Sequence, residues 1–517
     1  MKFFTKTRLA GLAIAISLAA GPLAATSVMA QDLNAPAAAA ATNAPAAAAT
    51  NAPATEAAPP AAAATTEIKA PEQKVDKGDT AWMLISTALV LVMTIPGLAL
   101  FYGGLVRQKN MLSMLMQVAT VTVLGMIAWA LWGYSLAFTD GGSHDAIVGG
   151  TSRLFLKGMT PASVVGTFST GVYIPEMVFF AFQMTFAAIT AALVLGSVAE
   201  RIKFSAVCVF AVVWPLLVYY PIAHMVWWWA GPDAVATHPN DPIAAGFVWS
   251  KGAIDFAGGT VVHINAGIAA LVACLLLGPR KGYGAEPMPP HSLVMSLIGA
   301  GLLWFGWFGF NAGSNLEANG YAALAMINTF LATAMAGFSW IVAEWLIRGK
   351  PSMLGMASGM VAGLVAVTPA AGFAGPMGSI VLGLVVSPIC VFAVSTVKNL
   401  FKYDDSLDAF GVHCIGGITG AIATGILVNP ALGGAGIVDY TTCAKDGDIL
   451  TCDTAAYDMG HQLISQLWGV GTTLLWSGII STVIFLAIKY TIGLRVSAEV
   501  EEEGLDITEH GERAYHV

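Results

Sequence analysis

The feature that most constrains the fold of this chain is a series of apolar segments, each about 20 residues long, between about residues 80 and 490. A segment of that length and composition crosses the hydrocarbon core of a bilayer as an α-helix. The chain of 517 residues is 56% hydrophobic and only 10% charged, whereas roughly a quarter of the residues in soluble domains are charged. This composition excludes a soluble enzyme, a nucleic-acid binder with a basic face and a disordered scaffold.

The apolar segments number eleven, which predicts an all-α polytopic membrane protein with eleven transmembrane helices. Their lengths suit tilted helices that cross roughly 30 Å of hydrocarbon. We expect the membrane domain to occupy residues 79–493. The predicted spans are 80–101, 112–138, 174–198, 204–227, 256–278, 291–312, 319–347, 353–370, 376–400, 408–428 and 462–490.

The N-terminal part of the chain differs from this apolar body. Residues 1–30 are typical of a secretory signal peptide, because basic residues precede a short apolar run and Val28-Met29-Ala30 offers a cleavage site. A first transmembrane helix is less favoured, because the run is short and Gly21-Pro22 ends it. Residues 31–78 are rich in Ala and Pro, which predicts an extended linker, and cleavage of the signal peptide would place this linker on the outer side of the membrane.

The distribution of basic residues predicts which way the helices face. Alternate loops hold ten Lys or Arg residues, and the intervening loops hold four. Basic loops stay in the cytoplasm, so the first helix starts outside and an odd number of helices places the C-terminus inside. The predicted cytoplasmic tail, residues 494–517, is acidic, with seven Asp or Glu residues and one Arg after Ser497.

Six cysteines are too few for a disulfide framework in a chain of this length. Cys443 and Cys452 fall in one predicted outer loop, where oxidation is possible, and the sequence leaves open whether they form a disulfide. The other four lie in apolar segments and are interpreted as packing residues.

Two segments of the chain share a spacing of charged and ionisable residues. Asp255 precedes His263 by eight residues in the fifth predicted helix, and Asp405 precedes His413 by eight residues in the tenth. Because five is an odd number, the two copies cross the membrane in opposite directions. This pattern indicates a 5+5 inverted repeat with a transport pathway between its halves.

The two histidines are candidate pore residues. An ionisable side chain inside an apolar span is costly, so its presence points to a function. The structural alternative, a neutral imidazole bonded to one backbone carbonyl, fits a lone histidine better than two at matched positions. A metal site is not favoured, because no set of metal ligands accompanies the pair. We expect His263 and His413 to meet and share a proton in a narrow, dry passage.

Two further residues have alternative interpretations. Asp255 can cap the following helix or attract a cation near the outer mouth, and we favour a mainly structural role with an electrostatic contribution. His224 is interpreted as interfacial structure, because the tryptophans at 227–229 are typical of an aromatic belt.

Six motifs, in order along the chain, resemble the signatures of the ammonium transporters of the Amt/Rh family. They are MTIPGLALFYGGLVR (93–107), AERIKFSAV (199–207), PIAHMVW (221–227), DFAGGTVVHINAG (255–267), WFGFNAGS (307–314) and FGVHCIGG (410–417). The resemblance covers the chain from residue 79 to the C-terminus. It implies the Amt/Rh fold, a homotrimer whose protomers each contain a pore, ammonium or ammonia as the substrate, and no cofactor.

The same resemblance implies roles for individual residues, matched motif by motif. The external ammonium-binding site would contain Trp227, Phe182 and Ser314, with Asp255 beside it. Phe186 and Phe310 would form the phenyl gate below that site, and His263 and His413 would line the pore. Chemistry agrees, because an aromatic wall attracts a small cation and a hydroxyl accepts one of its N–H groups. The alternative for each aromatic residue is ordinary packing.

An apolar pore of this kind predicts a mechanism. Potassium resembles ammonium in size and charge, but only ammonium can lose a proton. Bare charge crosses an apolar passage at a high cost, whereas neutral ammonia crosses easily. We therefore expect deprotonation near the gate, passage of ammonia along the histidines and reprotonation inside.

The resemblance also implies that the tail packs under the trimer and helps a PII-type signalling protein to plug the pores. The alternative is a solvated acidic tail. Two other functions stay open: a sensor that reports ammonium binding through the tail, and a facilitator of another small neutral solute, as in the Rh branch. Trp227 beside the gate favours ammonium, by resemblance.

Overall fold

The structure is a computed structural model that describes residues 73–238, 242–446 and 449–515. The predicted signal peptide (1–30) and most of the predicted linker (31–78) lie outside these residues. The described part contains ten helices long and apolar enough to cross a membrane, and a shorter apolar helix, α14 (Met353–Val367). The predicted all-α polytopic fold with eleven apolar helices is confirmed.

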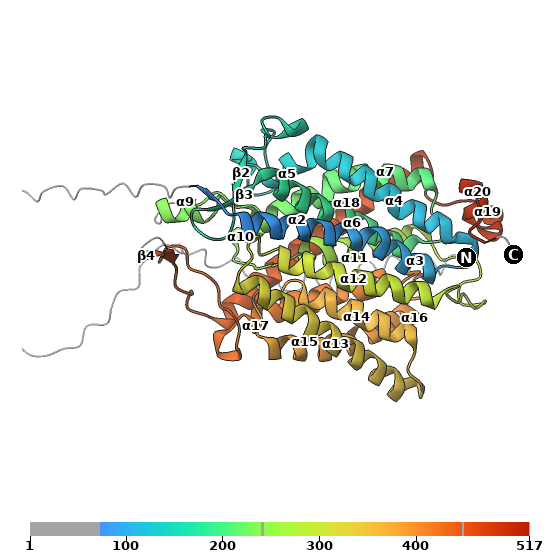
Figure 1. Ribbon diagram of the computed structural model, residues 1–517. Helices are drawn as coiled ribbons and strands as arrows, with labels where there is room; N and C mark the ends of the chain where they lie inside the picture. The colour runs from blue at the N-terminus through green and yellow to red at the C-terminus, as the bar shows by residue number, and fades with distance from the viewer. Residues whose placement is uncertain (1–72, 239–241, 447–448, 516–517) are drawn as a thin grey trace, which may run out of the picture.

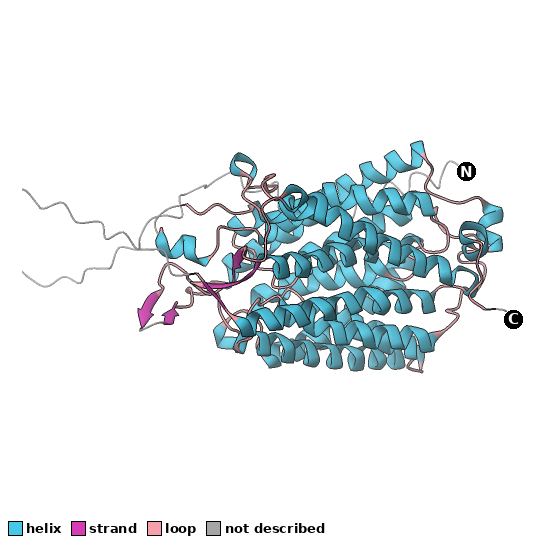
Figure 2. Ribbon diagram, turned by 45° about the horizontal axis from the view of Figure 1, so that its top comes forward, coloured by secondary structure: helices cyan, strands magenta, loops and turns pink. Residues whose placement is uncertain are grey.

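The apolar helices run side by side through the body of the molecule (Figures 1 and 2). Several contain a short π-helical segment, and one begins with a 3-10 turn, η2 (Gln108–Asn110); both kinds of segment are labelled η. In chain order they are α2–η1–α3 (Lys77–Leu105), η2–α4–η3–α5 (Gln108–Phe138), α6 (Glu176–Val198), α7–η6–α8 (Phe204–Trp227), η7–α11 (Gly259–Leu277), α12 (Leu293–Gly313), α13 (Gly320–Arg348), α14, α15–η8–α16 (Pro376–Phe401), η9–α17 (Phe410–Leu427) and α18 (Met459–Thr491).

The two ends of the body carry different structures (Figure 1). At the end called the loop face here, β1 (Lys74–Val75) and β2 (Val164–Gly166) flank β3 (Val172–Pro175), with β1 parallel and β2 antiparallel to it. The same face carries α9 (Pro232–Thr237), α10 (Phe247–Ser250) and the hairpin of β4 (Ala444–Asp446) and β5 (Ile449–Thr451). The opposite end, the tail face, carries α19 (Ala498–Glu503) and α20 (Leu505–His510).

Two details at the loop face bear on the sequence analysis. Strand β1 falls within the range predicted as linker, so the described body begins before residue 79. Cys443 and Cys452 form a disulfide next to the β4–β5 hairpin, which resolves the question that the sequence left open.

Two helices that carry predicted site residues, α6 with Phe182 and Phe186 and η7–α11 with His263, lie in the interior of the molecule. In α6 and in η7–α11, 78% and 89% of the most apolar stretch is buried against other helices, whereas the value for α18 is 33%. A helix that is apolar all round and largely uncovered presents its remaining surface to lipid. The burial therefore places α6 and η7–α11 in the interior and α18 at the periphery.

The two halves of the predicted repeat pack on each other reciprocally. Segment α11 contacts η9 (Phe410–Cys414), and α17 (Ile415–Leu427) contacts η7 (Gly259–Ile264). Glycines allow this approach: a Cβ on Gly267 would lie 2.4 Å from the backbone nitrogen of Cys414, and one on Gly417 would lie 2.9 Å from the carbonyl oxygen of Gly259. Close helix crossings of this kind require residues without side chains.

Candidate permeation site

Two aspartates cap the starts of η7 and η9, the helical segments that contain His263 and His413. The Asp255 carboxylate accepts backbone hydrogen bonds from residues 258–261, at 2.6–3.2 Å, and one from the Thr260 hydroxyl. The Asp405 carboxylate accepts them from residues 409–411, at 2.9–3.4 Å, and from the Ser197 hydroxyl. The first N–H groups of a helix lack partners within it. The structure thus supports the capping interpretation of Asp255.

His263 and His413 meet where η7 and η9 cross. Their Nδ1 atoms are 3.3 Å apart, and their rings are stacked with centroids 5.3 Å apart and an interplanar angle of 20°. One Nδ1 donates and the other accepts, so one of the two Nε2 atoms carries a hydrogen and the other a lone pair. The described residues contain no group of three or more His, Cys, Asp or Glu able to hold a metal ion.

A stack of aromatic rings extends from the histidine pair. The ring of Phe310, on α12, lies 6.1 Å from His263 and stacks on Phe186 of α6 at 4.0 Å between centroids. Phe182, one helical turn before Phe186, lies 4.9 Å from it. All three phenyl rings are buried. The residues predicted as a gate are therefore in direct contact, and they adjoin the histidine pair.

The remaining predicted binding residues lie beside this stack. Trp227, at the end of α8 (Tyr220–Trp227), contacts Phe186 edge-on at 6.0 Å, and its Nε1 donates to the Asp255 carbonyl oxygen at 2.8 Å. Ser314 follows the last residue of α12, and its hydroxyl donates to the Phe310 carbonyl oxygen at 2.8 Å. That bond uses the hydroxyl hydrogen and leaves the oxygen lone pairs able to accept.

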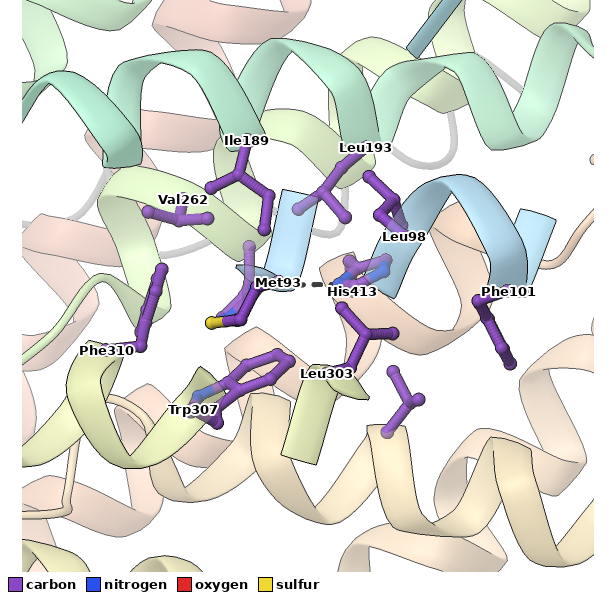
Figure 3. Close-up of a pocket in the computed structure, with 12 residues that line it drawn as sticks. Met93, Leu98, Phe101, Ile189, Leu193, Val262, Leu303, Trp307, Phe310 and His413 are labelled. Carbon is purple, nitrogen blue, oxygen red and sulfur yellow. Dashed lines mark hydrogen bonds between the residues drawn. The ribbon is translucent and has the colours of Figure 1, made fainter. Parts of the chain in front are cut away.

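A narrow cavity lies on the other side of Phe310 and contains the histidine pair (Figure 3). Apart from the imidazoles and the indole nitrogen of Trp307, its wall is apolar. The lining residues are Met93, Leu98, Phe101, Ile189, Leu193, Val262, His263, Leu303, Trp307, Phe310, Val361 and His413.

Trp307 belongs to this site, although the sequence analysis assigned it no role. Its ring stacks beside His263 at 5.4 Å between centroids, and its Nε1 donates to the Thr368 hydroxyl at 2.9 Å. The signal was present in the motif WFGFNAGS, since Trp307 precedes Phe310 by one helical turn and shares its face.

A second cavity continues from the first toward the tail face. The two share Phe101, Val361 and His413. The second cavity is lined partly by polar side chains, among them Arg280, Ser406 and Asp408. His413 thus stands between an apolar cavity and a polar one.

A cluster of buried charges holds the loops of the tail face together. Glu200 accepts hydrogen bonds from Arg107 at 2.7 Å and from Arg280 at 3.4 Å, and Asp404 pairs with Arg280 at 2.9 Å. Burial alone raises the pKa of Glu200, but Arg280 and Arg107 outweigh it and hold that pKa below its ordinary value of 4.5. The pKa of Asp404 is also lowered: burial opposes ionisation of its carboxyl, but Arg280 and Arg201 hold the pKa below its ordinary value of 3.8.

The acidic tail packs on the helices of its own chain, which corrects the alternative of a solvated tail. The Asp506 carboxylate accepts hydrogen bonds from the first N–H groups of α4 (Met111–Ala128), at Leu112 and Ser113. The Glu501 carboxylate accepts from the Lys281 N–H and from Arg495, both at 2.6 Å.

The interpretation of residues 227–229 as an aromatic belt is wrong for Trp228. Its ring is buried and stacks on the His224 imidazole at 4.8 Å between centroids, with an interplanar angle of 11°. His224 itself is buried, with both ring nitrogens bonded to backbone carbonyl oxygens. Packing against the preceding helical turn, rather than contact with lipid, accounts for this tryptophan.

Comparison with known proteins agrees with this geometry. The sequence model of the Ammonium Transporter Family matches residues 81–515. The chain belongs to this family. An ammonium transporter of Aquifex aeolicus is 45% identical to it over 450 residues, which cover 87% of this chain and 96% of the relative. An ammonium transporter of Bacillus subtilis is 43% identical over 441 residues, covering 85% and 98%.

Two solved structures have the same fold. The crystal structure of Saccharomyces cerevisiae Mep2 aligns with a TM-score of 0.69 and 31% identity, covering 82% of this chain and 91% of Mep2. A structure described as a Sensor Amt Protein aligns with a TM-score of 0.71 and 26% identity, covering 84% and 98%. The resemblance found in the sequence motifs is therefore confirmed at the level of the family and the fold.

Proposed function

We propose that this chain transports ammonium across a membrane by binding the cation at the loop face, removing one proton at the phenyl gate and passing ammonia along the histidine pair. One observation carries the proposal. The stacked rings of Phe186 and Phe310 adjoin a histidine pair that lies in an apolar cavity, and His413 of that pair also lines the polar cavity toward the tail face.

Recruitment would use the residues outside the gate. The faces of Trp227 and Phe182 attract a small cation through their ring quadrupoles. The Ser314 oxygen accepts one ammonium N–H group, because its own hydrogen is already donated to Phe310. Asp255 contributes through its backbone, since its carbonyl oxygen fixes the Trp227 indole while its carboxylate caps η7.

The gate and pore would enforce deprotonation. The rings of Phe186 and Phe310 stack at 4.0 Å and exclude hydrated ions. Beyond them, a cation would enter an apolar cavity, where its loss of hydration costs several kcal/mol. The cation therefore gives one proton to water at the gate, and the neutral ammonia that remains enters the cavity without this cost. The two Nε2 atoms, one a donor and one an acceptor, then suit ammonia, which both accepts and donates hydrogen bonds.

The cellular setting completes the proposal. We place the protein in the bacterial inner membrane as a homotrimer, with the signal peptide (1–30) cleaved and the linker (31–78) in the periplasm. Residues 79–493 form the transport domain, and the tail (494–517) faces the cytoplasm. The docked tail supports a regulatory role, in which a PII-type signalling protein binds at the tail face.

Uptake of methylammonium by proteoliposomes tests this function. We expect the wild type to accumulate methylammonium in the presence of excess potassium, and Trp227→Ala and His413→Ala to lose most of that uptake for different reasons. Trp227→Ala weakens recruitment, so its uptake should recover at high substrate concentration, whereas that of His413→Ala should not. A wild type that only binds methylammonium would contradict transport and favour a sensor.

A further inference from the structure

His224 has an environment that the proposed transport route does not explain. It lies on α8, three residues before Trp227, and is buried. Its Nδ1 atom is 3.0 Å from the carbonyl oxygen of Ala137, and its Nε2 atom is 2.9 Å from the carbonyl oxygen of Asp145. Both partners belong to the stretch from the end of α5 (Tyr134–Phe138) to Gly149, which we call the α5 loop.

Two carbonyl partners determine the protonation of the ring. A carbonyl oxygen only accepts hydrogen bonds, so each ring nitrogen must carry a hydrogen to bond with it. A neutral imidazole has one N–H group and would face the other carbonyl oxygen with a lone pair, at a repulsive distance. Only the imidazolium cation satisfies both contacts.

The surroundings favour a cation at this position. The Asp145 carboxylate lies 4.0 Å from Nε2, and Asp140 adds a second negative charge that acts on the ring. The Ala137 carbonyl belongs to the last turn of α5, where a helix stabilises positive charge. Both of these charged groups are acidic. Burial opposes the charge and is the largest single influence on it, whereas the two carbonyls and the two carboxylates favour the charged ring.

His224 lies next to the proposed recruitment site. The ring of Trp228 stacks on His224, and the Trp228 carbonyl oxygen accepts the N–H of Gly246 at 2.9 Å. The next residue, Phe247, donates its N–H to the Ala146 carbonyl oxygen at 2.9 Å. The α5 loop, α8 and the start of α10 are therefore joined around one imidazole, one helical turn from Trp227.

We propose that His224 is a positioning residue that acts as an imidazolium: it clasps the α5 loop to the end of α8 and so holds Trp227 in place. The assignment to recruitment rests on the function proposed for Trp227, whereas the clasp does not. When the imidazolium loses a proton, the ring keeps one N–H group and can bond to only one of the two carbonyl oxygens. The α5 loop is therefore held at low pH and released as the pH rises.

Hydrogen–deuterium exchange tests the clasp without reference to transport. The N–H groups of Ile147, Val148 and Gly149 are bonded within the α5 loop and report its opening. With intrinsic exchange corrected for pH, we expect their protection in the full-length protein to fall roughly tenfold between pH 5 and pH 9, the effect of losing one charge-assisted hydrogen bond. Protection that does not change with pH would overturn the proposal.

Three variants identify the group that titrates. His224→Gln should give low protection at every pH, because one amide nitrogen cannot replace two ring nitrogens. Asp145→Asn keeps the backbone carbonyl but removes the neighbouring charge, so the transition should move to lower pH. His144→Gln removes an exposed histidine of the same loop and should behave as the wild type. A transition that persists in His224→Gln, or is unmoved in Asp145→Asn, would contradict the clasp.

Transport then tests the link to Trp227. We expect the KM for methylammonium in the wild type to rise along the same pH transition, and His224→Gln to have a high, pH-independent KM with kcat little changed. If the exchange results support the clasp while KM is the same in both proteins at every pH, the clasp stands and its role in recruitment is refuted. Failure of transport in the wild type would instead refute the proposed function.

Discussion

At the scale of residues, the account depends on side chains whose partners are few and well defined. His413 has the His263 ring as its hydrogen-bond partner and lines both cavities. We expect His413→Ala to reduce methylammonium uptake roughly tenfold, because the pore loses one hydrogen-bonding group and His263 loses its partner. Uptake into proteoliposomes measures this. His461→Ala, an exposed histidine of α18, is the control, and wild-type uptake by His413→Ala would contradict the pore assignment.

Phe310 provides a separate prediction about selectivity. Its ring is buried and closes the stack on Phe186. Truncation to alanine opens a path for partly hydrated ions, so we expect rubidium flux through Phe310→Ala to rise clearly above that of the wild type. Phe305→Ala, five residues earlier on α12 and 56% exposed, should leave rubidium flux at background. If rubidium flux through Phe310→Ala stays at the wild-type level, the rings do not form the barrier to ions.

The residues of the site differ in how well the sequence predicts them. The equal spacing from Asp255 to His263 and from Asp405 to His413 predicts that the imidazoles meet, because a repeat of opposite direction brings matched positions together. Trp307 could not be assigned in this way, since its contact with His263 depends on how α12 crosses η7. Trp228 was predicted incorrectly, because a run of tryptophans does not reveal which ring faces the interior.

At the scale of elements, the crossing of the two half-repeats is a tight contact. A Cβ on Gly267 would lie 2.4 Å from the backbone of Cys414, which cannot move as a flexible side chain does. We expect Gly267→Ala to destabilise the protein by about 1–3 kcal/mol. Thermal unfolding in detergent measures the change. Gly301→Ala on α12, where a Cβ meets no atom within 4 Å, should leave the Tm unchanged or higher.

The charge cluster of the tail face predicts a dependence on pH. The pKa of Glu200 in the folded protein lies below 4.5, so its ionisation stabilises the fold above that pH. This stabilisation is lost as the pH falls below 4.5 and through the folded-state pKa. We expect the Tm of the wild type to decrease over that range and the Tm of Glu200→Gln to be lower and less sensitive to acid. Glu503→Gln, an exposed acid of α19, should follow the wild type.

Some elements of this fold can be predicted from the sequence and others cannot. The eleven helices are readable because each apolar segment must satisfy its backbone hydrogen bonds within itself in lipid. The π-helical turns that carry His263 and His413 are not readable, because they depend on the aspartate caps and on the glycine contacts between half-repeats. The docked tail was also undetermined, since its partners, such as Ser113 and Lys281, are hundreds of residues away.

At the scale of the whole molecule, the inverted repeat explains why one path exists. Two helices of opposite direction place their histidines at one point and their caps at opposite ends, so the imidazoles lie between the stacked phenyl rings and a polar cavity. Neither half contains such a path alone. We expect both halves to be needed for transport, and the loop face and tail face to serve separate tasks, recruitment and release.

The central claim is that the cargo must give up a proton to pass. The most direct test compares ammonium with rubidium, a potassium-like cation that has no proton to lose, in the same proteoliposomes under the same gradient. The account predicts ammonium-dependent transport with rubidium flux at the level of protein-free vesicles. Rubidium flux comparable to that of ammonium through the wild-type protein would contradict it.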